Sequence, residues 1–319
     1  MTARPSTAHA WSPEMMPPGR PVAVRSADGT RLHAEVFGPP DGYPIVLSHG
    51  FVCAIRVWAY QIIDLAKEFR VIAFDHRGHG RSGIPKSGHY SLNHLAADLD
   101  AVLAATLAPG ERAVIAGHSM GGMTVNAWSA RYPHRVERCA DAVALINTTT
   151  GELLDNIDLL PFPRSMVPTR RLAAANLIRV ISGFPVPGVF APPLRPLVGM
   201  MAVGATADPV LTDFVYELFE QTPPAGRGGC GRALTRDVGR YYMNLAGLTV
   251  PALVVGSARD RLTPLKQARR IAEDVPDLFK LVELPGGHCS ILEHPDRVNE
   301  DLRSLITAAA GSRRRELSS

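Results

Sequence analysis

The chain has 319 residues and a formal net charge of +4, from 34 Lys and Arg against 30 Asp and Glu. Apolar residues make up 46% and charged residues 20% of it, which excludes extensive disorder and predicts a well-buried core. The basic residues are scattered and not interleaved with aromatic ones, so we expect no nucleic-acid partner. No stretch of about 20 apolar residues runs without Pro or charge, so we expect no transmembrane segment.

Both ends of the chain look irregular. Residues 1–20 are rich in Pro and small polar residues and lack the apolar core of a secretory signal, so we expect a disordered extension and no export. Residues 311–319 carry three consecutive arginines and are expected to form a flexible basic tail. The four cysteines show no close pairing or metal-type spacing, so we expect reduced thiols in a cytoplasmic protein: Cys53, Cys139, Cys230 and Cys289.

The first half of the chain alternates between predicted strands and helices. Residues 22–26 and 32–37 flank an Asp-Gly turn and predict a β-hairpin. A helix is expected to begin near Ser91, a plausible N-cap, and to end before Pro109-Gly110. Short apolar runs predict buried strands at 44–48, 70–75, 113–118 and 142–147. Such alternation is typical of a parallel sheet.

The alternation stops at residues 148–245, which contain many prolines, and then resumes. A strand at 252–257, a helix after Pro264, a strand at 279–284 and a helix at 295–310 follow. We therefore expect one α/β domain, formed by residues 21–147 and 246–310, with 148–245 inserted as a cap or lid.

A Gly-x-Ser-x-Gly pattern at residues 117–121 lies between a predicted strand and a helix-compatible stretch. A sharp turn there would impose strained dihedral angles on Ser119 and leave its hydroxyl exposed as a nucleophile. The competing interpretation is a glycine-rich turn with an incidental serine. A serine hydroxyl is a weak nucleophile near neutral pH, so the first interpretation requires a base and a group that orients this base.

Two downstream residues meet that requirement. His288 follows the last predicted strand, where a loop can bring its imidazole to the carboxyl edge of the sheet. Asp260 follows the strand at 252–257, although it could instead be a surface residue paired with a neighbouring arginine. We expect Ser119, Asp260 and His288 to form a catalytic triad. His118 adjoins the serine, but its side chain should point away because side chains alternate along a strand.

A tetrahedral intermediate would need donors for its negative charge. We expect the backbone amides of Met120 and Phe51 to form this oxyanion hole, the second from the loop at 49–51. Gly50 could instead merely permit a turn, and Phe51 could be ordinary core. No cofactor or metal ion is required by this chemistry.

These motifs together resemble the α/β-hydrolase superfamily over roughly residues 22–310. The motifs that carry the resemblance are His49-Gly50-Phe51, the segment from Asp75 to Ser82, Gly117 to Gly122, Asp260 and Gly287-His288. The resemblance implies an α/β fold with a mostly parallel central sheet, flanking helices and an inserted helical cap. It also implies that the loop from Asp75 to Ser82 shapes the wall of the active site without entering the chemistry.

The resemblance implies a lipase-like carboxylesterase that acts through an acyl-Ser119 intermediate. Epoxide hydrolases and haloalkane dehalogenases of this superfamily have an aspartate as nucleophile, and both activities are disfavoured by Ser119. A perhydrolase or haloperoxidase-like activity and a noncatalytic ligand-binding protein remain alternatives. A carbon–carbon bond hydrolase is a further alternative, although such enzymes often have more small residues after Gly50 than the Phe51-Val52-Cys53 found here.

The apolar content of the cap favours a small-molecule ester with an apolar acyl or alcohol group. The same residues could instead pack against the core. Peripheral membrane contact through the cap is a weaker hypothesis, and the oligomeric state stays open.

Overall fold

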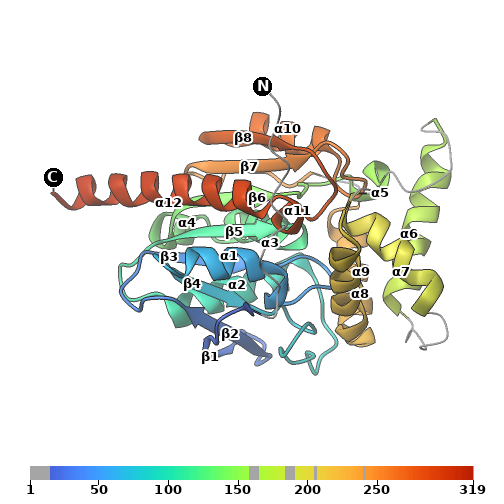
Figure 1. The fold of residues 1–319 in the computed structure, drawn as a ribbon, viewed down its shortest axis with the longest axis horizontal. Coiled ribbons are helices and arrows are strands. Elements are labelled where there is room, and N and C mark those ends of the chain that lie inside the picture. The colour runs from blue at the N-terminus through green and yellow to red at the C-terminus, as the bar shows by residue number, and fades with distance from the viewer. Residues whose placement is uncertain (1–14, 158–164, 184–190, 205–206, 240–241, 319) are drawn as a thin grey trace.

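The computed structural model describes residues 15–157, 165–183, 191–204, 207–239 and 242–318. Within these ranges, eight strands form one sheet in the order β1-β2-β4-β3-β5-β6-β7-β8, with helices on both of its faces (Figure 1). The pairs β1–β2 and β2–β4 are antiparallel. Every following pair in this order, from β4–β3 to β7–β8, is parallel. The predicted α/β fold with a mostly parallel sheet is therefore confirmed.

The strands agree closely with the sequence pattern. Their bounds are β1 Arg20–Arg25, β2 Arg31–Phe37, β3 Pro44–Ser48, β4 Arg70–Phe74, β5 Ala113–His118, β6 Ala140–Ile146, β7 Ala252–Ser257 and β8 Leu278–Leu284. The predicted hairpin is confirmed by antiparallel pairing of Val24 with Leu32. Asn147, predicted as the last residue of a strand, instead follows β6 with a φ of 43°. This left-handed conformation ends the strand.

The helices lie between the strands as the alternation predicts. They are the 3₁₀ helix η2 Ile55–Trp58, α1 Ala59–Leu65, α2 Leu92–Thr106, α3 Met120–Arg131, α4 Pro133–Cys139, α5 Leu153–Asn156, α6 Val167–Gly183, α7 Ala191–Ala202, α8 Pro209–Gln221, α9 Pro224–Asp237, α10 Leu265–Asp274, α11 Ser290–Glu293 and α12 Pro295–Ser318. The Ser91 side chain accepts a hydrogen bond from the His94 amide, which confirms this N-cap. None of the helices within the described ranges is both long and apolar enough to cross a bilayer.

The final helix is longer than predicted. The sequence pattern placed its end at residue 310 and a flexible tail at 311–319, but α12 continues through Ser318. Residues 311–318 include good helix formers, and the Arg313 guanidinium donates a hydrogen bond to the Gly110 carbonyl. The prediction of an irregular tail is therefore wrong for residues 311–318. The predicted N-terminal extension falls mostly outside the described residues.

The central strands are buried on both faces, which explains their continuous apolar runs. In β3, Ile45 and Leu47 pack into one core layer and Val46 into the other. In β5, Val114 and Ala116 alternate in the same way with Ile115. A buried parallel sheet brings the carboxyl ends of its strands to one edge, and the loops at that edge carry the predicted site residues.

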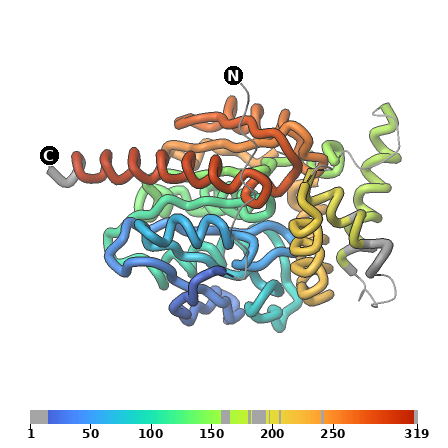
Figure 2. The backbone as a smooth tube through the Cα atoms, in the orientation of Figure 1, coloured from blue at the N-terminus to red at the C-terminus, as the bar shows by residue number. Residues whose placement is uncertain are grey.

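The insertion between β6 and β7 contains helices α5 to α9, and we call residues 148–245 the cap. Helices α6 to α9 lie together at one end of the molecule, beyond the edge of the sheet (Figures 1 and 2). Helix α9 packs very closely on the loop after β4: a Cβ added at Gly226 would lie 1.8 Å from the Gly78 carbonyl oxygen. This contact requires glycine at position 226.

Candidate active site

Ser119 occupies a strained turn between β5 and α3. Its φ of 55° and ψ of −120° lie outside the backbone conformations that residues other than glycine favour. Met120 begins the helix immediately after it. The two flanking glycines allow the turn. A Cβ at Gly117 would lie 2.5 Å from the Gly121 backbone, and one at Gly121 would lie 2.0 Å from the Ser48 carbonyl oxygen. This sharp turn places the Ser119 hydroxyl above the edge of the sheet.

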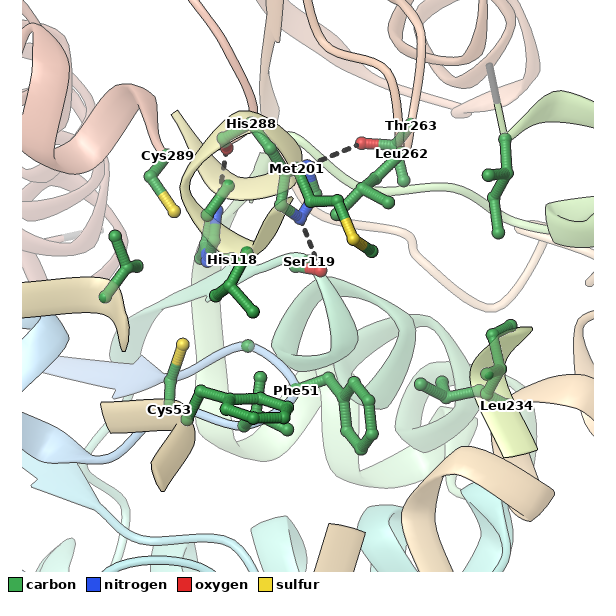
Figure 3. Close-up of a pocket in the computed structure, with 18 of the residues that line it drawn as sticks. Phe51, Cys53, His118, Ser119, Met201, Leu234, Leu262, Thr263, His288 and Cys289 are labelled. Carbon is green, nitrogen blue, oxygen red and sulfur yellow. Dashed lines mark hydrogen bonds between the residues drawn. The ribbon is translucent and has the colours of Figure 1, made fainter. Parts of the chain in front are cut away.

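The structure brings the three predicted residues into one hydrogen-bonded chain. His288 Nε2 lies 2.8 Å from Ser119 Oγ, and His288 Nδ1 lies 2.8 Å from Asp260 Oδ2 (Figure 3 shows the Ser119 contact). Because a carboxylate only accepts, Nδ1 carries the proton and Nε2 is left to accept the serine proton. The chain thus has the geometry of a nucleophile, its base and the group that orients the base.

The Asp260 carboxylate is almost completely surrounded by donors. Its Oδ1 accepts from the amides of Leu262 and Thr263, and its Oδ2 accepts from the Thr263 hydroxyl at 2.8 Å as well as from His288. Burial by itself would raise the pKa of Asp260, but attraction to His288 and these hydrogen bonds outweigh it and lower the pKa. The acid is therefore ionised at neutral pH, and its alternative interpretation as a surface aspartate is wrong.

Asn147 is a member of this network that sequence reasoning missed. Its amide nitrogen donates to Asp260 Oδ2 at 3.1 Å and to Ser257 Oγ at 2.9 Å. Its oxygen accepts from the hydroxyl of Ser290, which lies two residues after His288. The amide thus links the acid to the loop of the base. Its position at the end of a predicted central strand was the available signal, because side chains at that edge face the site.

The loop after β3 lies close to Ser119: a Cβ added at Gly50, next to Phe51, would lie 3.2 Å from the Ser119 Cβ. Val52, the next residue, has a φ of 52°, and its amide donates to His79 Nε2 at 3.2 Å. His49 Nε2 accepts from the His76 amide, so its Nδ1 carries the proton and donates to the Gly50 carbonyl at 2.7 Å. Met120 is the first residue of α3, so its amide has no partner within the helix.

Four buried histidines around this loop are neutral. Burial lowers the pKa of each one: to about 3 for His76 and His118, to about 4 for His79, and well below the usual value for His49. Their rings therefore act as fixed hydrogen-bonding groups near neutral pH.

His118 has a contact that the sequence did not predict. Its ring does not bond to the Ser119 hydroxyl; instead Nε2 donates to the backbone carbonyl of His288 at 3.0 Å (Figure 3). The two imidazole centroids lie 5.0 Å apart. The residue before the serine therefore supports the backbone of the histidine loop.

Comparison with known proteins finds sequences and structures similar to this chain. A sequence model of the α/β hydrolase fold family matches residues 43–185. A non-heme chloroperoxidase from Streptomyces lividans is 29% identical over 89% of this chain and 98% of its own length. A bifunctional esterase/perhydrolase from Acinetobacter calcoaceticus is 27% identical over 89% and 98%. The structure of the enol-lactonase from Burkholderia xenovorans LB400 superposes with a TM-score of 0.69, at 27% identity over 89% of this chain and 99% of the enzyme.

By its fold, the chain is an α/β hydrolase. In this α/β hydrolase, the loop from Asp75 to Ser82 makes structural contacts. Asp75 accepts hydrogen bonds from the amides of Ile55 and Arg81, and the Arg77 guanidinium forms two bonds of 2.6 Å with the Asp98 carboxylate. These contacts connect the loop to neighbouring elements and not to the Ser119 hydroxyl.

A cavity of about 140 Å³ lies over Ser119 in the α/β hydrolase, between the core domain and the cap. The core contributes Ser119, His288 and residues 50–53, with Phe51 and His288 on different sides of Ser119 in Figure 3. The described residues that line it include no Asp, Glu, Lys, Arg, Asn or Gln. The cap contributes apolar side chains that include Leu177, Ile178, Val198, Met201, Phe219 and Leu234.

The cysteines and metal-binding residue types form no further site in the described part of this α/β hydrolase. All four cysteines are buried and unbridged, and burial raises the pKa of Cys53 to about 12. Across the described ranges, no three His, Cys, Asp or Glu side chains are grouped so that they could hold a metal ion. Cys53 and Cys289 therefore present neutral thiols to the cavity.

Proposed function

We propose that this α/β hydrolase is a serine esterase that cleaves a carboxylic ester with an apolar acyl or alcohol part. The observation that carries the proposal is the hydrogen-bonded chain of Ser119, His288 and Asp260 at the floor of an apolar cavity. An isolated serine turn would explain neither the buried acid nor the base held between acid and serine.

Acylation begins when Ser119 Oγ attacks the ester carbonyl carbon. His288 Nε2 takes the serine proton, and Asp260 stabilises the imidazolium that forms. Collapse of the tetrahedral intermediate breaks the bond to the alcohol oxygen, and His288 returns the proton to that oxygen. Water then attacks acyl-Ser119, again with His288 as the base, which releases the carboxylic acid and regenerates the serine.

We propose that the oxyanion formed at each step accepts hydrogen bonds from the amides of Phe51 and Met120. Neighbouring contacts support both amides: the amide of Val52, next to Phe51, donates to His79, and Met120 begins α3. Donors held in advance stabilise the transition state without having to reorganise, and removing one such donor typically costs about 3–4 kcal/mol of barrier.

The wall of the cavity favours a neutral, apolar substrate. Burying a charged group among side chains such as Leu177 and Met201 would leave the charge without a partner, at a high cost in free energy. Apolar groups gain about 25 cal/mol for each Å² removed from water. We therefore expect turnover to rise with acyl length until the cavity is filled.

The test is active-site labelling with a fluorophosphonate, followed by intact mass, together with a panel of p-nitrophenyl esters of increasing acyl length. We expect one adduct and ester turnover in the wild type, and loss of both in Ser119→Ala. Ser312→Ala, which changes a residue on the distal part of α12, is the control and should keep both activities. A wild type that neither reacts nor turns over would contradict the proposal and favour a ligand-binding protein.

A second candidate, perhydrolysis, is favoured by the comparisons, because relatives of this chain are named chloroperoxidase and bifunctional esterase/perhydrolase. Hydrogen peroxide would replace water in the second step and attack acyl-Ser119, releasing a peracid. Measuring peracid formation from an acetate ester and peroxide tests this directly. Peracid that persists in Ser119→Ala would show that it does not arise at this site.

A further inference from the structure

Glu293, the last residue of α11, bends its carboxylate back toward two backbone segments. Its Oε1 accepts from the Gly287 amide at 2.9 Å, and its Oε2 lies 3.1 Å from the same nitrogen. Gly287 directly precedes His288. Oε2 also accepts from the Gly204 amide at 2.9 Å, and Gly204 lies just after α7 of the cap. One carboxylate thus bonds to the histidine loop and to the cap.

Two further contacts join the same segments. The Cys289 amide donates to the Ala202 carbonyl at 2.8 Å. The backbones also touch directly, since a Cβ added at Gly287 would lie 2.4 Å from the Gly204 nitrogen. Gly287, before His288, is therefore bonded to the Glu293 carboxylate, which also binds the segment after α7. Cys289, after His288, is bonded to Ala202, the last residue of α7.

The end of α7 is also part of the cavity wall. Val198, Met201 and Ala202 line the cavity over Ser119, and Cys289 lines it from the histidine loop. A shift of α7 would change the space available to the substrate, and the same shift would pull on the backbone beside the base. The position of the cap wall and the position of His288 are thus set by shared contacts.

We propose that Glu293 is a positioning residue that holds His288 and the α7 wall of the cavity in one arrangement, and so determines both turnover and preference for acyl length. The proposal rests on the esterase function proposed above. Glu293 takes no part in the chemistry. Without its carboxylate, the buried amides of Gly204 and Gly287 lose their acceptor, and both segments move to find another.

The proposal is tested by measuring kcat and KM of Glu293→Ala at 25 °C with p-nitrophenyl acetate and p-nitrophenyl hexanoate. We expect kcat to fall about tenfold with both esters, the effect of a hydrogen bond lost near the base. We expect KM to rise about fivefold more for hexanoate than for acetate, because the longer chain reaches the displaced wall. Glu293→Gln keeps the shape and one acceptor oxygen, so it should fold and give intermediate values.

Glu283→Ala is the matched control, since Glu283 is a surface residue of β8 that pairs with Arg269. It should match the wild type in kcat and KM with both esters. Hydrogen exchange provides a readout that does not depend on activity: the Gly204 and Gly287 amides should exchange faster in Glu293→Ala than in Glu283→Ala. If the wild type has no esterase activity but exchange is still faster in Glu293→Ala, the proposed contacts stand and the esterase function is rejected.

Three outcomes would overturn the proposal. In the first, Glu293→Ala lowers only the Tm and leaves kcat and KM within about twofold of the wild type, as a purely structural residue would. In the second, KM changes equally for both esters. In the third, the Gly204 and Gly287 amides exchange no faster in Glu293→Ala than in Glu283→Ala.

Discussion

At the scale of single residues, the site depends on backbone groups and polar side chains that hold the three reacting residues. Ser119 and Val52 both have positive φ values, and each is kept in place by its neighbours. The Ser119 amide donates to the Ile146 carbonyl, and its own carbonyl accepts from the Thr148 hydroxyl at 2.7 Å. The strain is therefore balanced by hydrogen bonds to Ile146 at the end of β6 and to Thr148 just after it.

Asn147 gives the most direct residue-scale prediction. Replacing it with alanine removes a donor to Asp260 and leaves the Ser290 hydroxyl without its acceptor. We expect kcat to fall about tenfold, equivalent to about 1.4 kcal/mol, with little change in KM because the amide does not line the cavity. Kinetics with p-nitrophenyl acetate measures the effect. Asn93→Ala, at an exposed position in α2, should leave kcat unchanged; an equal loss there would argue against a specific role for Asn147.

At the scale of elements, helix α9 attaches the cap to the core at both of its ends. Its closest contact is Gly226 against Gly78, in the loop after β4. The Leu92 amide donates to the Asp237 carboxylate, so the other end of α9 contacts the start of α2. Both ends of one cap helix thus contact the core, while Leu234 between them lines the cavity.

Gly226→Ala should weaken this attachment. The added methyl group would lie 1.8 Å from the Gly78 oxygen, so α9 must move, and we expect a loss of about 1–3 kcal/mol in the free energy of unfolding. We also expect a higher KM for hexanoate esters. Urea unfolding and ester kinetics measure the two effects.

Gly311→Ala is the matched control for this substitution. An added Cβ there meets only the end of the Arg315 side chain at 3.9 Å within α12, so the change should stabilise the helix by about 0.5–1 kcal/mol. If both variants had the same stability, the close contact of Gly226 would be unimportant.

At the scale of the whole molecule, buried histidines make the fold sensitive to acid. His49, His76, His79 and His118 are all held neutral because burial lowers their pKa values in the folded state. An unfolded chain binds protons at these positions near pH 6.5, whereas the folded chain does so only at much lower pH. Their contribution to stability is therefore fully present above about pH 6.5 and is lost as the pH falls toward their folded values.

The free energy of unfolding should accordingly decrease between pH 6.5 and 5, by up to about 1.4 kcal/mol per pH unit for each histidine. Urea unfolding at several pH values measures this slope. His79→Gln, which can still accept from the Val52 amide, should have a shallower slope, and the exposed His134→Gln should not differ from the wild type. Constant stability from pH 7 to 5 would show that the four rings are not held neutral.

Much of the fold was predictable because its signals are local. Buried parallel strands read as short apolar runs, and helices such as α2 carry a recognisable N-cap and periodicity, so the order of elements followed directly. The end of α12 was mispredicted because three arginines suggest a solvated tail. A helix and such a tail have similar compositions, and the contact of Arg313 with Gly110, distant in sequence, is not visible locally.

The sequence by itself determined the fold class and named Ser119, Asp260 and His288, because each follows a strand in a distinctive turn and the order of the three is itself informative. Only the tertiary structure decided that these residues meet within 2.8 Å, that Asn147 and His118 support them, and that Glu293 bonds the histidine loop to the cap. Such contacts join positions up to 170 residues apart. They depend on how loops and helices pack at the sheet edge, which no local pattern of residues encodes.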